Sequence, residues 1–225
     1  MIPWVFILVS FFASVIGCIC GIGGGVIIKP VLDSFGLYSV STISFMSGCI
    51  VLSMTAYSVL KAQLAHESVI EKEISIYLGL GAAIGGLLGK QLFDAIKDLF
   101  AQADTVGAVQ AAALFAVTLG TAVYTVCKSR IRTYQVTAPV LCAGIGLILG
   151  ILYDFLGIGG GPVNLVVLYF FFSMETKIAA QNSLYIILLS QAASLLFTIL
   201  TGRIPEFPGV LFACMVCCGI LGGAV

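Results

Sequence analysis

The sequence predicts an all-α integral membrane protein built from two homologous repeats. Of its 225 residues, 60% are hydrophobic and only 9% are charged, whereas soluble domains have about 45–50% apolar and about 25% charged residues. Long uncharged runs alternate with short charged segments, and one glycine-rich motif occurs twice. The ten basic and ten acidic residues cancel, so no excess of positive charge indicates a nucleic-acid partner.

About seven segments are predicted to cross the bilayer, because a spanning helix needs about 20 mostly apolar residues. Four long runs meet this length without a charge: residues 34–60, 105–127, 133–153 and 178–202. Three further segments are interrupted by glycines or are shorter: residues 2–28, 74–89 and 207–225. The first of these lacks the positive start and the cleavage site of a signal peptide, so we expect it to remain in the protein.

The motif Gly-Ile-Gly-Gly-Gly occurs at residues 21–25 and again at residues 157–161. The offset is 136 residues, the difference between positions 157 and 21, and it also aligns Ser47 with Ser183 and Ser58 with Ser194. Each repeat is expected to hold about four helices, namely a glycine-broken helix, a short re-entrant or half helix, and ordinary spanning helices. The resulting units are a first membrane repeat (1–127), a basic cytoplasmic linker (128–135) and a second membrane repeat (136–225).

The second repeat is expected to lack its final helix. With one residue inserted, Gly85-Gly86 aligns with Gly222-Gly223, which places the last residue opposite Leu88. The first repeat continues from there for about 39 residues, the difference between positions 127 and 88. Either the chain is shortened or this copy of the repeat has no final helix.

The linker contains three basic residues and no acid, and short basic loops normally face the cytoplasm. With single crossings counted outward from the linker, the basic residues on its side are Lys61, Lys72 and Arg203. Those expected outside or within the membrane are Lys29, Lys90, Lys97 and Lys177. If the short segments cross the membrane instead of re-entering it, the repeats are inverted and not parallel, and the sequence leaves both arrangements open.

The two glycine clusters are predicted to leave helical geometry, to meet at the centre of the molecule and to line a substrate site. A helix break at membrane depth is stable only where it is buried in protein or lines a cavity, and glycine allows close approach of a ligand. A short helix beginning after each cluster, at Pro162 in the second copy, would present unpaired N–H groups that favour an anion. Close packing of helices through small residues is the alternative.

Because few fixed positive charges are expected at depth, dipoles of the backbone and of neutral side chains would hold a compact oxyanion. The candidate substrate-binding residues are Gly23, Gly24, Gly25, Ser47, Gly159, Gly160, Gly161, Asn164, Asn182 and Ser183.

Two charged residues lie next to the glycine clusters. Asp154 is the acid placed deepest between two apolar runs, and a carboxyl group at that depth usually faces a cavity, pairs with another group or exchanges protons. We interpret it as a candidate for proton coupling, with a position at the membrane interface as the alternative. Lys29 would either add positive charge to the anion site or, as we favour, extend to the lipid headgroups.

No cofactor, metal site or enzymatic arrangement is predicted. Most of the eight cysteines lie in apolar runs, where a thiol normally packs as a small apolar group, and the single histidine is distant from them in sequence. No Ser-His pair or pair of carboxylates indicates catalysis. The expected partners are a small anionic substrate and the lipid bilayer, with a homo-oligomer left open.

The segments that carry the motifs resemble the TauE/SafE sulfite exporter family, also called the toluene sulfonate uptake permeases. The similar segments are residues 21–32, residues 157–162, Ala-Gln-Asn-Ser at 180–183, and Gly85-Gly86. The resemblance covers nearly the whole chain and implies a multi-pass transporter of the bacterial or archaeal inner membrane. It implies small sulfur-containing anions as substrates: sulfite, thiosulfate, sulfate or sulfonates. A channel-like or regulatory membrane protein, whose glycines only pack helices, is the alternative function.

Overall fold

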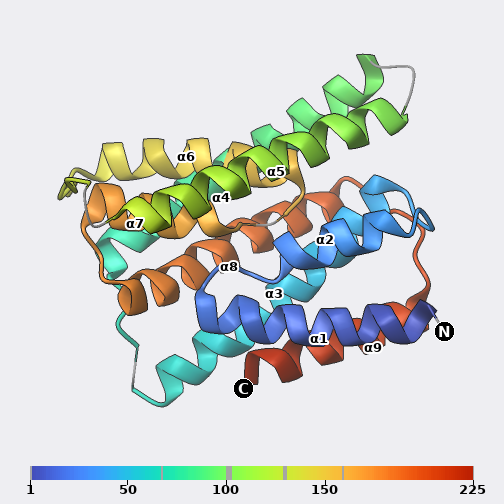
Figure 1. The fold of residues 1–225 in the computed structure, drawn as a ribbon, viewed down its shortest axis with the longest axis horizontal. Coiled ribbons are helices and arrows are strands. Elements are labelled where there is room, and N and C mark those ends of the chain that lie inside the picture. Colours follow the sequence, from blue (N-terminus) through green and yellow to red (C-terminus); the bar gives the residue numbers. More distant parts are fainter. Residues whose placement is uncertain (1, 67, 100–102, 129–130, 159, 225) are drawn as a thin grey trace.

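The described part of this computed structural model, residues 2–66, 68–99, 103–128, 131–158 and 160–224, is all-helical, as predicted (Figure 1). Nine helices and no strand occur among these residues. The first five helices are α1 (Ile2–Cys20), α2 (Gly25–Ser34), α3 (Val40–Leu64), α4 (Lys72–Leu99) and α5 (Ala103–Cys127). The remaining four are α6 (Pro139–Leu156), α7 (Pro162–Phe172), α8 (Thr176–Leu200) and α9 (Gly209–Ala224).

Five of these helices, α3, α4, α5, α6 and α8, are long and apolar enough to cross a membrane. The four long uncharged runs in the sequence all coincide with members of this set. Residues 74–89 form part of α4, which continues as helix to Leu99 because no proline or glycine follows Gly89 within it. Helices α1, α7 and α9 are apolar but shorter.

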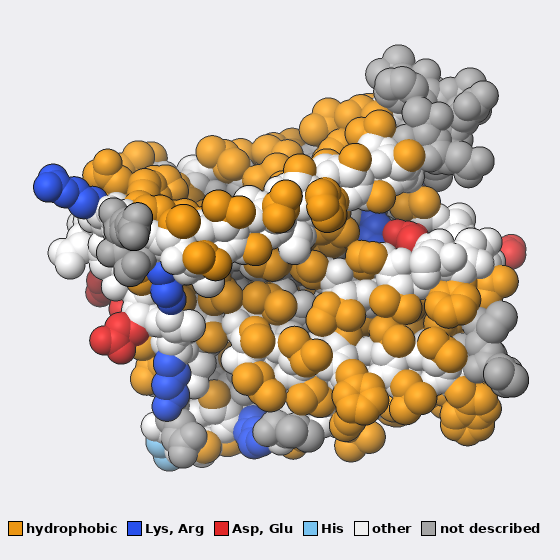
Figure 2. Space-filling model, viewed as in Figure 1, with side chains coloured by type: hydrophobic (Ala, Val, Ile, Leu, Met, Phe, Trp, Pro, Cys, Tyr) orange, Lys and Arg blue, Asp and Glu red, His pale blue; other side chains and the backbone are white. Residues whose placement is uncertain are grey.

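Large hydrophobic side chains cover much of the outer surface. Trp4 is 71% exposed, Phe115 70% and Val140 83%, and similar side chains line the outward faces of α3, α4, α8 and α9. Figure 2 shows one such face, on which hydrophobic side chains dominate and Lys and Arg side chains gather toward the left edge. Exposure of apolar area to water costs about 25 cal/mol per Å², so this surface is suited to lipid.

Helices α3 and α8 pack together at the centre, between two hydrophobic cores. On one flank α4 packs against α6 and α8, with α5 and α7 beside them. Leu78 and Tyr153 are fully buried in that core. On the other flank α9 packs against α1 and α3, with α2 beside them, and Phe6 and Met215 are fully buried there.

Glycines bring α4 and α6 into backbone contact. Gly85 of α4 faces the carbonyl group of Leu147, and Gly146 of α6 faces the carbonyl group of Leu78, each closer than a Cβ atom would allow. On the other flank Gly222 of α9 approaches the backbone of α1 in the same way. Small residues at these positions permit the close helix crossings that are common in membrane proteins.

The pairs α1–α2 and α6–α7 form two helix hairpins that enter the molecule from opposite ends (Figure 1). Helix α2 returns toward the start of α1, where the rings of Phe6 and Phe35 pack edge to face with centroids 5.2 Å apart. Helix α7 returns toward the start of α6, where the N–H of Tyr134 donates to the carbonyl of Phe170 at 2.7 Å. The glycine clusters form the turns of these hairpins.

We call the end of the molecule that holds the linker and the starts of α4, α6 and α8 the linker end, and the opposite end the cavity end. The direction of α7 corrects the expected distribution of charge. Because α7 runs back to the linker end, α8 starts there, and Lys128 donates to the hydroxyl of Thr176 at 3.2 Å. Lys177 therefore lies at the linker end with Lys61 and Lys72, whereas Arg203 lies at the cavity end, the reverse of what single crossings predicted.

Candidate functional site

The backbone leaves helical geometry at both glycine clusters, as predicted. Gly21 and Gly23 have φ values of 69° and 67°, and Gly157 and Gly160 have φ values of 64° and 112°. L-residues with side chains rarely adopt these values, which explains why glycine occupies the positions. Gly159 lies outside the described residues. Helix α7 begins at Pro162, the residue predicted from its position after Gly161.

The two clusters also meet, as predicted. A side chain added at Gly25 would overlap the carbonyl oxygen of Ile158, which lies inside the second cluster. The hydroxyl oxygen of Ser47 would lie 3.3 Å from the same added atom. Between the clusters and α8, Ile187 packs against both Gly23 and Gly160. The glycines thus allow two backbone segments to approach each other near the middle of the molecule.

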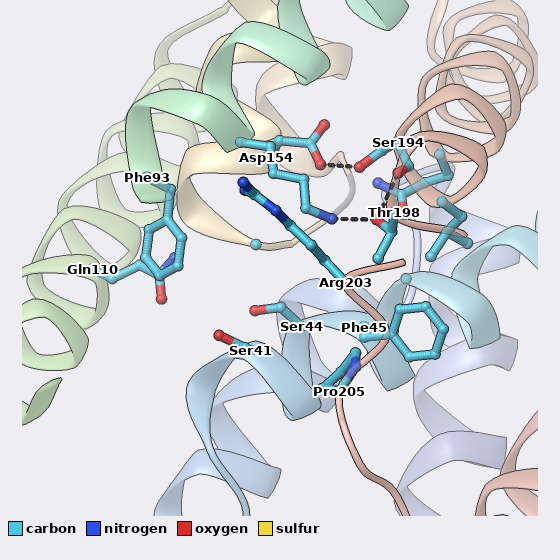
Figure 3. Close-up of a pocket in the computed structure, with 15 residues that line it drawn as sticks. Ser41, Ser44, Phe45, Phe93, Gln110, Asp154, Ser194, Thr198, Arg203 and Pro205 are labelled. Carbon is cyan, nitrogen blue, oxygen red and sulfur yellow. Dashed lines mark hydrogen bonds between the residues drawn. The ribbon is translucent and has the colours of Figure 1, made fainter. Parts of the chain in front are cut away.

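A cavity of about 360 Å³ lies beside this contact and is lined by residues from α3, α4, α5, α6, α8 and the α8–α9 loop (Figure 3). Its charged lining residues in the described chain are Lys90, Asp154 and Arg203. Its neutral polar lining residues are Ser41, Ser44, Gln110, Gln191, Ser194 and Thr198. Gly157 is the cluster glycine that takes part in the described lining.

Asp154 is held by α8 and α4. One carboxylate oxygen, Oδ1, accepts a hydrogen bond from the hydroxyl of Ser194 at 2.5 Å, and the other, Oδ2, lies directly against Gly86. Lys90 donates to the hydroxyl of Thr198, one turn beyond Ser194 in α8. Figure 3 shows the Arg203 side chain extending from the α8–α9 loop into the same space. The interior position predicted for Asp154 is confirmed.

Lys29 is buried beside the cavity, so the favoured interpretation that it extends to the headgroups was wrong. Its side chain is only 2% exposed. Its amino group donates to the side-chain oxygen of Gln110 and to the carbonyl of Leu156, both at 2.6 Å. Leu156 is the last residue of α6, where the helix dipole is negative, so the position favours a cation.

The other predicted substrate-binding residues lie outside the described cavity lining. Ser47 and Asn164 are fully buried near the clusters, and Ser47 Oγ and Asn164 Nδ2 have no hydrogen-bond partner among the described residues. Ser183 donates to the carbonyl of Gly21 at 2.6 Å. Asn182 accepts hydrogen bonds from the N–H of Glu71 and the hydroxyl of Ser75 at the linker end.

Fixed positive charge, which we expected to be scarce at depth, is present in the cavity and beside it. Lys90 was missed because α4 is longer than its apolar run, and Arg203 was missed because it was assigned to the linker side. The only sequence signal for either residue is an isolated basic residue directly after a long apolar run. The interpretation that dipoles alone would hold an anion is therefore incomplete.

No metal centre is formed in the part of the chain that the structure describes: it contains no group of three His, Cys, Asp or Glu side chains placed as ligands. The eight cysteines are free thiols, distributed over α1, α3, α5, α6 and α9. Cys142 is buried in the hydrophobic core on the α4–α6 flank. The chemistry available in the cavity is consequently that of ammonium, guanidinium, carboxylate, hydroxyl and amide groups.

Comparison with known families decides the assignment. The family model described as sulfite exporter TauE/SafE matches residues 6–225, essentially the whole chain. The chain belongs to this family. No curated protein and no solved structure was found to match it.

The TauE/SafE family consists of membrane transporters, and the apolar helices and lipid-suited surface of this chain agree with a multi-pass membrane protein. The matched region includes both glycine clusters and every described residue that lines the cavity. In this TauE/SafE protein the cavity is therefore the site at which a transported solute has access to charged groups.

Proposed function

We propose that this protein is a secondary transporter of small sulfur-containing oxyanions, namely sulfite, thiosulfate, sulfate or simple sulfonates. The observation that carries the proposal is the cavity in which Lys90 and Arg203 lie together with Asp154 and six neutral polar side chains. Charged and neutral donors of this kind bind oxyanions through several hydrogen bonds. A volume of about 360 Å³ has room for on the order of ten waters, so a tetrahedral oxyanion fits with part of its hydration shell.

The contact pattern supports an inverted arrangement of two repeats. Helix α4 of the first unit packs against α6 of the second, and α9 of the second packs against α1 of the first. Helices α3 and α8, which are equivalent in the two units, form the central pair. The α1–α2 and α6–α7 hairpins enter from opposite ends, as inverted repeats require. Transporters of this kind place the substrate between the repeats, where the cavity lies.

Charge supports a cytoplasmic linker end in a cell membrane. Five basic residues described at that end are Lys61, Lys72, Lys128, Arg132 and Lys177, against Lys29, Lys90 and Arg203 toward the cavity end. Cytoplasmic loops carry such an excess of Lys and Arg. The cavity would then belong to the outer side of the membrane.

Asp154 would couple anion binding to protons. Lys90 on α4 and Arg203 on the α8–α9 loop are the described cations that line the cavity with it, and Lys29 is buried nearby. When Asp154 is ionised, its negative charge opposes the binding of an anion. Protonation removes that charge, so the cavity attracts the anion more strongly as the pH falls. Proton and anion would consequently move in the same direction.

We expect Asp154→Asn to tighten anion binding at neutral pH by several-fold and to abolish the pH dependence of uptake. The asparagine keeps the size of the side chain and an oxygen that can accept from Ser194, but it cannot ionise. The measurement is initial uptake into proteoliposomes from mildly acid to mildly basic pH. Glu206→Gln, at an exposed acid of the same end, is the matched control and should keep the wild-type profile. An unchanged profile in Asp154→Asn would exclude Asp154 from coupling.

The proposed function is tested with purified protein in proteoliposomes and radiolabelled sulfate. We expect saturable uptake that depends on an imposed gradient and that sulfite, thiosulfate and a small sulfonate inhibit competitively. Large organic anions and cations should not compete, because the cavity is small and its described charges are mostly positive. Flux that increases linearly with concentration would instead indicate a channel, and transport of a cation alone would refute the proposal.

A further inference from the structure

A second polar pair occupies the position in the first unit that Asp154 and Ser194 occupy in the second. The thiol of Cys18 in α1 lies 3.1 Å from the hydroxyl of Ser58 in α3. Positions 18 and 58 become 154 and 194 with the same offset of 136 residues that relates the two glycine motifs. Both pairs therefore join the helix before a glycine cluster to the long helix after it.

The surroundings of the two pairs correspond as well. Asp154 lies against Gly86 of α4, and the thiol of Cys18 lies 3.9 Å from the carbonyl of Gly223 in α9. Gly86 and Gly223 are the residues that align when one residue is inserted in the repeat. These contacts were not used in finding the repeat, so they are independent support for equivalent positions.

The glycine turns next to the pairs follow the same rule. Gly157 faces the hydroxyl of Ser44, which lines the cavity, and Gly21 faces Ala180. Positions 44 and 180 again differ by 136. The offset therefore predicts, residue by residue, which part of the molecule corresponds to the cavity.

That corresponding part is closed. Cys18 packs with Val59 and Leu184 in a hydrophobic cluster that also contains Met54. Val59 and Leu184 are the equivalents of Leu195 and Gly48, both of which line the cavity. Equivalent positions are thus open at the cavity end and packed together toward the linker end, which is the asymmetry that alternating exposure of one site between two inverted repeats requires.

We propose that the cluster around Cys18 and Ser58 is the closed second mouth of the transport path, and that it opens to the linker end when the present cavity closes. This inference rests on the proposed transport function and names the residues of its other half. The anion would then pass Cys18 and Ser58, whose thiol and hydroxyl can donate hydrogen bonds. Neither group is a carboxylate, so this mouth offers no counterpart to the charge of Asp154.

Hydrogen bonds between the α3–α4 loop and the start of α8 hold this mouth closed. Gln181 accepts from the N–H of Val69 at 3.0 Å. Asn182 accepts from the N–H of Glu71 at 2.9 Å and from Ser75 at 2.5 Å. A net contribution of about 0.5–1.5 kcal/mol for each bond means that removing the Asn182 side chain raises the open fraction roughly three-fold or more.

The test measures the reaction of Cys18 with a membrane-impermeant methanethiosulfonate in proteoliposomes of known orientation. Peptide mass spectrometry of otherwise wild-type protein reports modification at each cysteine, so the other thiols need not be removed. We expect modification of Cys18 from the linker side and not from the cavity side, with a rate roughly three-fold or more higher in Asn182→Ala. Cys142, buried in the opposite core, is the internal control and should remain unmodified in both proteins.

Cys18 that stays unmodified from the linker side in both proteins, or that reacts equally from both sides, would overturn the proposal. Sulfate uptake by the same vesicles is measured in parallel. Intact uptake with an inert Cys18 would refute this second mouth and leave the transport function standing. A Cys18 that responds as expected in vesicles that carry no oxyanion would refute the assigned substrate and not the mouth.

Discussion

Lys90→Gln is expected to weaken oxyanion binding by about ten- to a hundred-fold. Hydrogen bonds to charged groups contribute about 1.5–3 kcal/mol each, and about 1.4 kcal/mol corresponds to a factor of ten in the dissociation constant. Lys90 is partly buried and its amino group contacts Thr198 within the cavity, so its charge is less screened than that of a surface lysine. Glutamine keeps hydrogen-bonding capacity and removes the charge.

The measurement is isothermal titration of purified protein with thiosulfate and with sulfate. Lys72→Gln provides a matched control, because Lys72 begins the same helix, is exposed at the linker end and should bind as wild type. Arg203→Gln should weaken binding less than Lys90→Gln, since the exposed guanidinium is better screened by solvent. Wild-type affinity in Lys90→Gln would show that the anion is not held in this cavity.

Gly146→Ala is expected to cause a large loss of thermal stability, although alanine is normally the better helix former. The added methyl group would overlap the carbonyl of Leu78 in α4, so α4 and α6 must separate or shift. Overpacking of this kind costs about 1–3 kcal/mol or more. Since Lys90 and Asp154 lie on these two helices, the cavity geometry should be lost together with stability.

Gly144→Ala tests this explanation on the same helix, because an atom added at Gly144 meets nothing within 4 Å. This substitution should be neutral or should stabilise by up to about 1 kcal/mol through higher helix propensity. The readout is the temperature of half-loss of monodisperse protein at a fixed heating rate. Equal effects of the two substitutions would show that backbone contact does not determine the packing of α4 on α6.

The cavity shows where prediction from sequence reached its limit. Asp154 was identified because a carboxyl group between two apolar runs is unusual wherever the chain folds. Lys90 and Arg203 are 113 positions apart in sequence, the difference between 203 and 90, and nothing local indicates that they meet. Their approach depends on α4 continuing beyond its apolar run and on α7 returning to the linker end.

Lys29 illustrates the same limit at one residue. A lysine four positions after a glycine cluster can extend to the headgroups or turn inward, and both conformations fit the sequence equally well. Inward placement requires acceptors, and these come from Gln110 of α5 and Leu156 of α6. Helices distant in sequence supply them, so only the folded chain distinguishes the two.

The sequence by itself determined the helical class, the long apolar helices, the two breaks at the glycine motifs and the start of α7 at Pro162. These features follow from local physical chemistry: hydrophobic length, the missing Cβ of glycine and the missing N–H of proline act on the residues that carry them. The tertiary structure decided the direction of the two hairpins, the end at which each charge lies and the side chains that share the cavity. These depend on which helices pack together, and contacts such as Gly146 against Leu78 form only when distant segments of the chain meet.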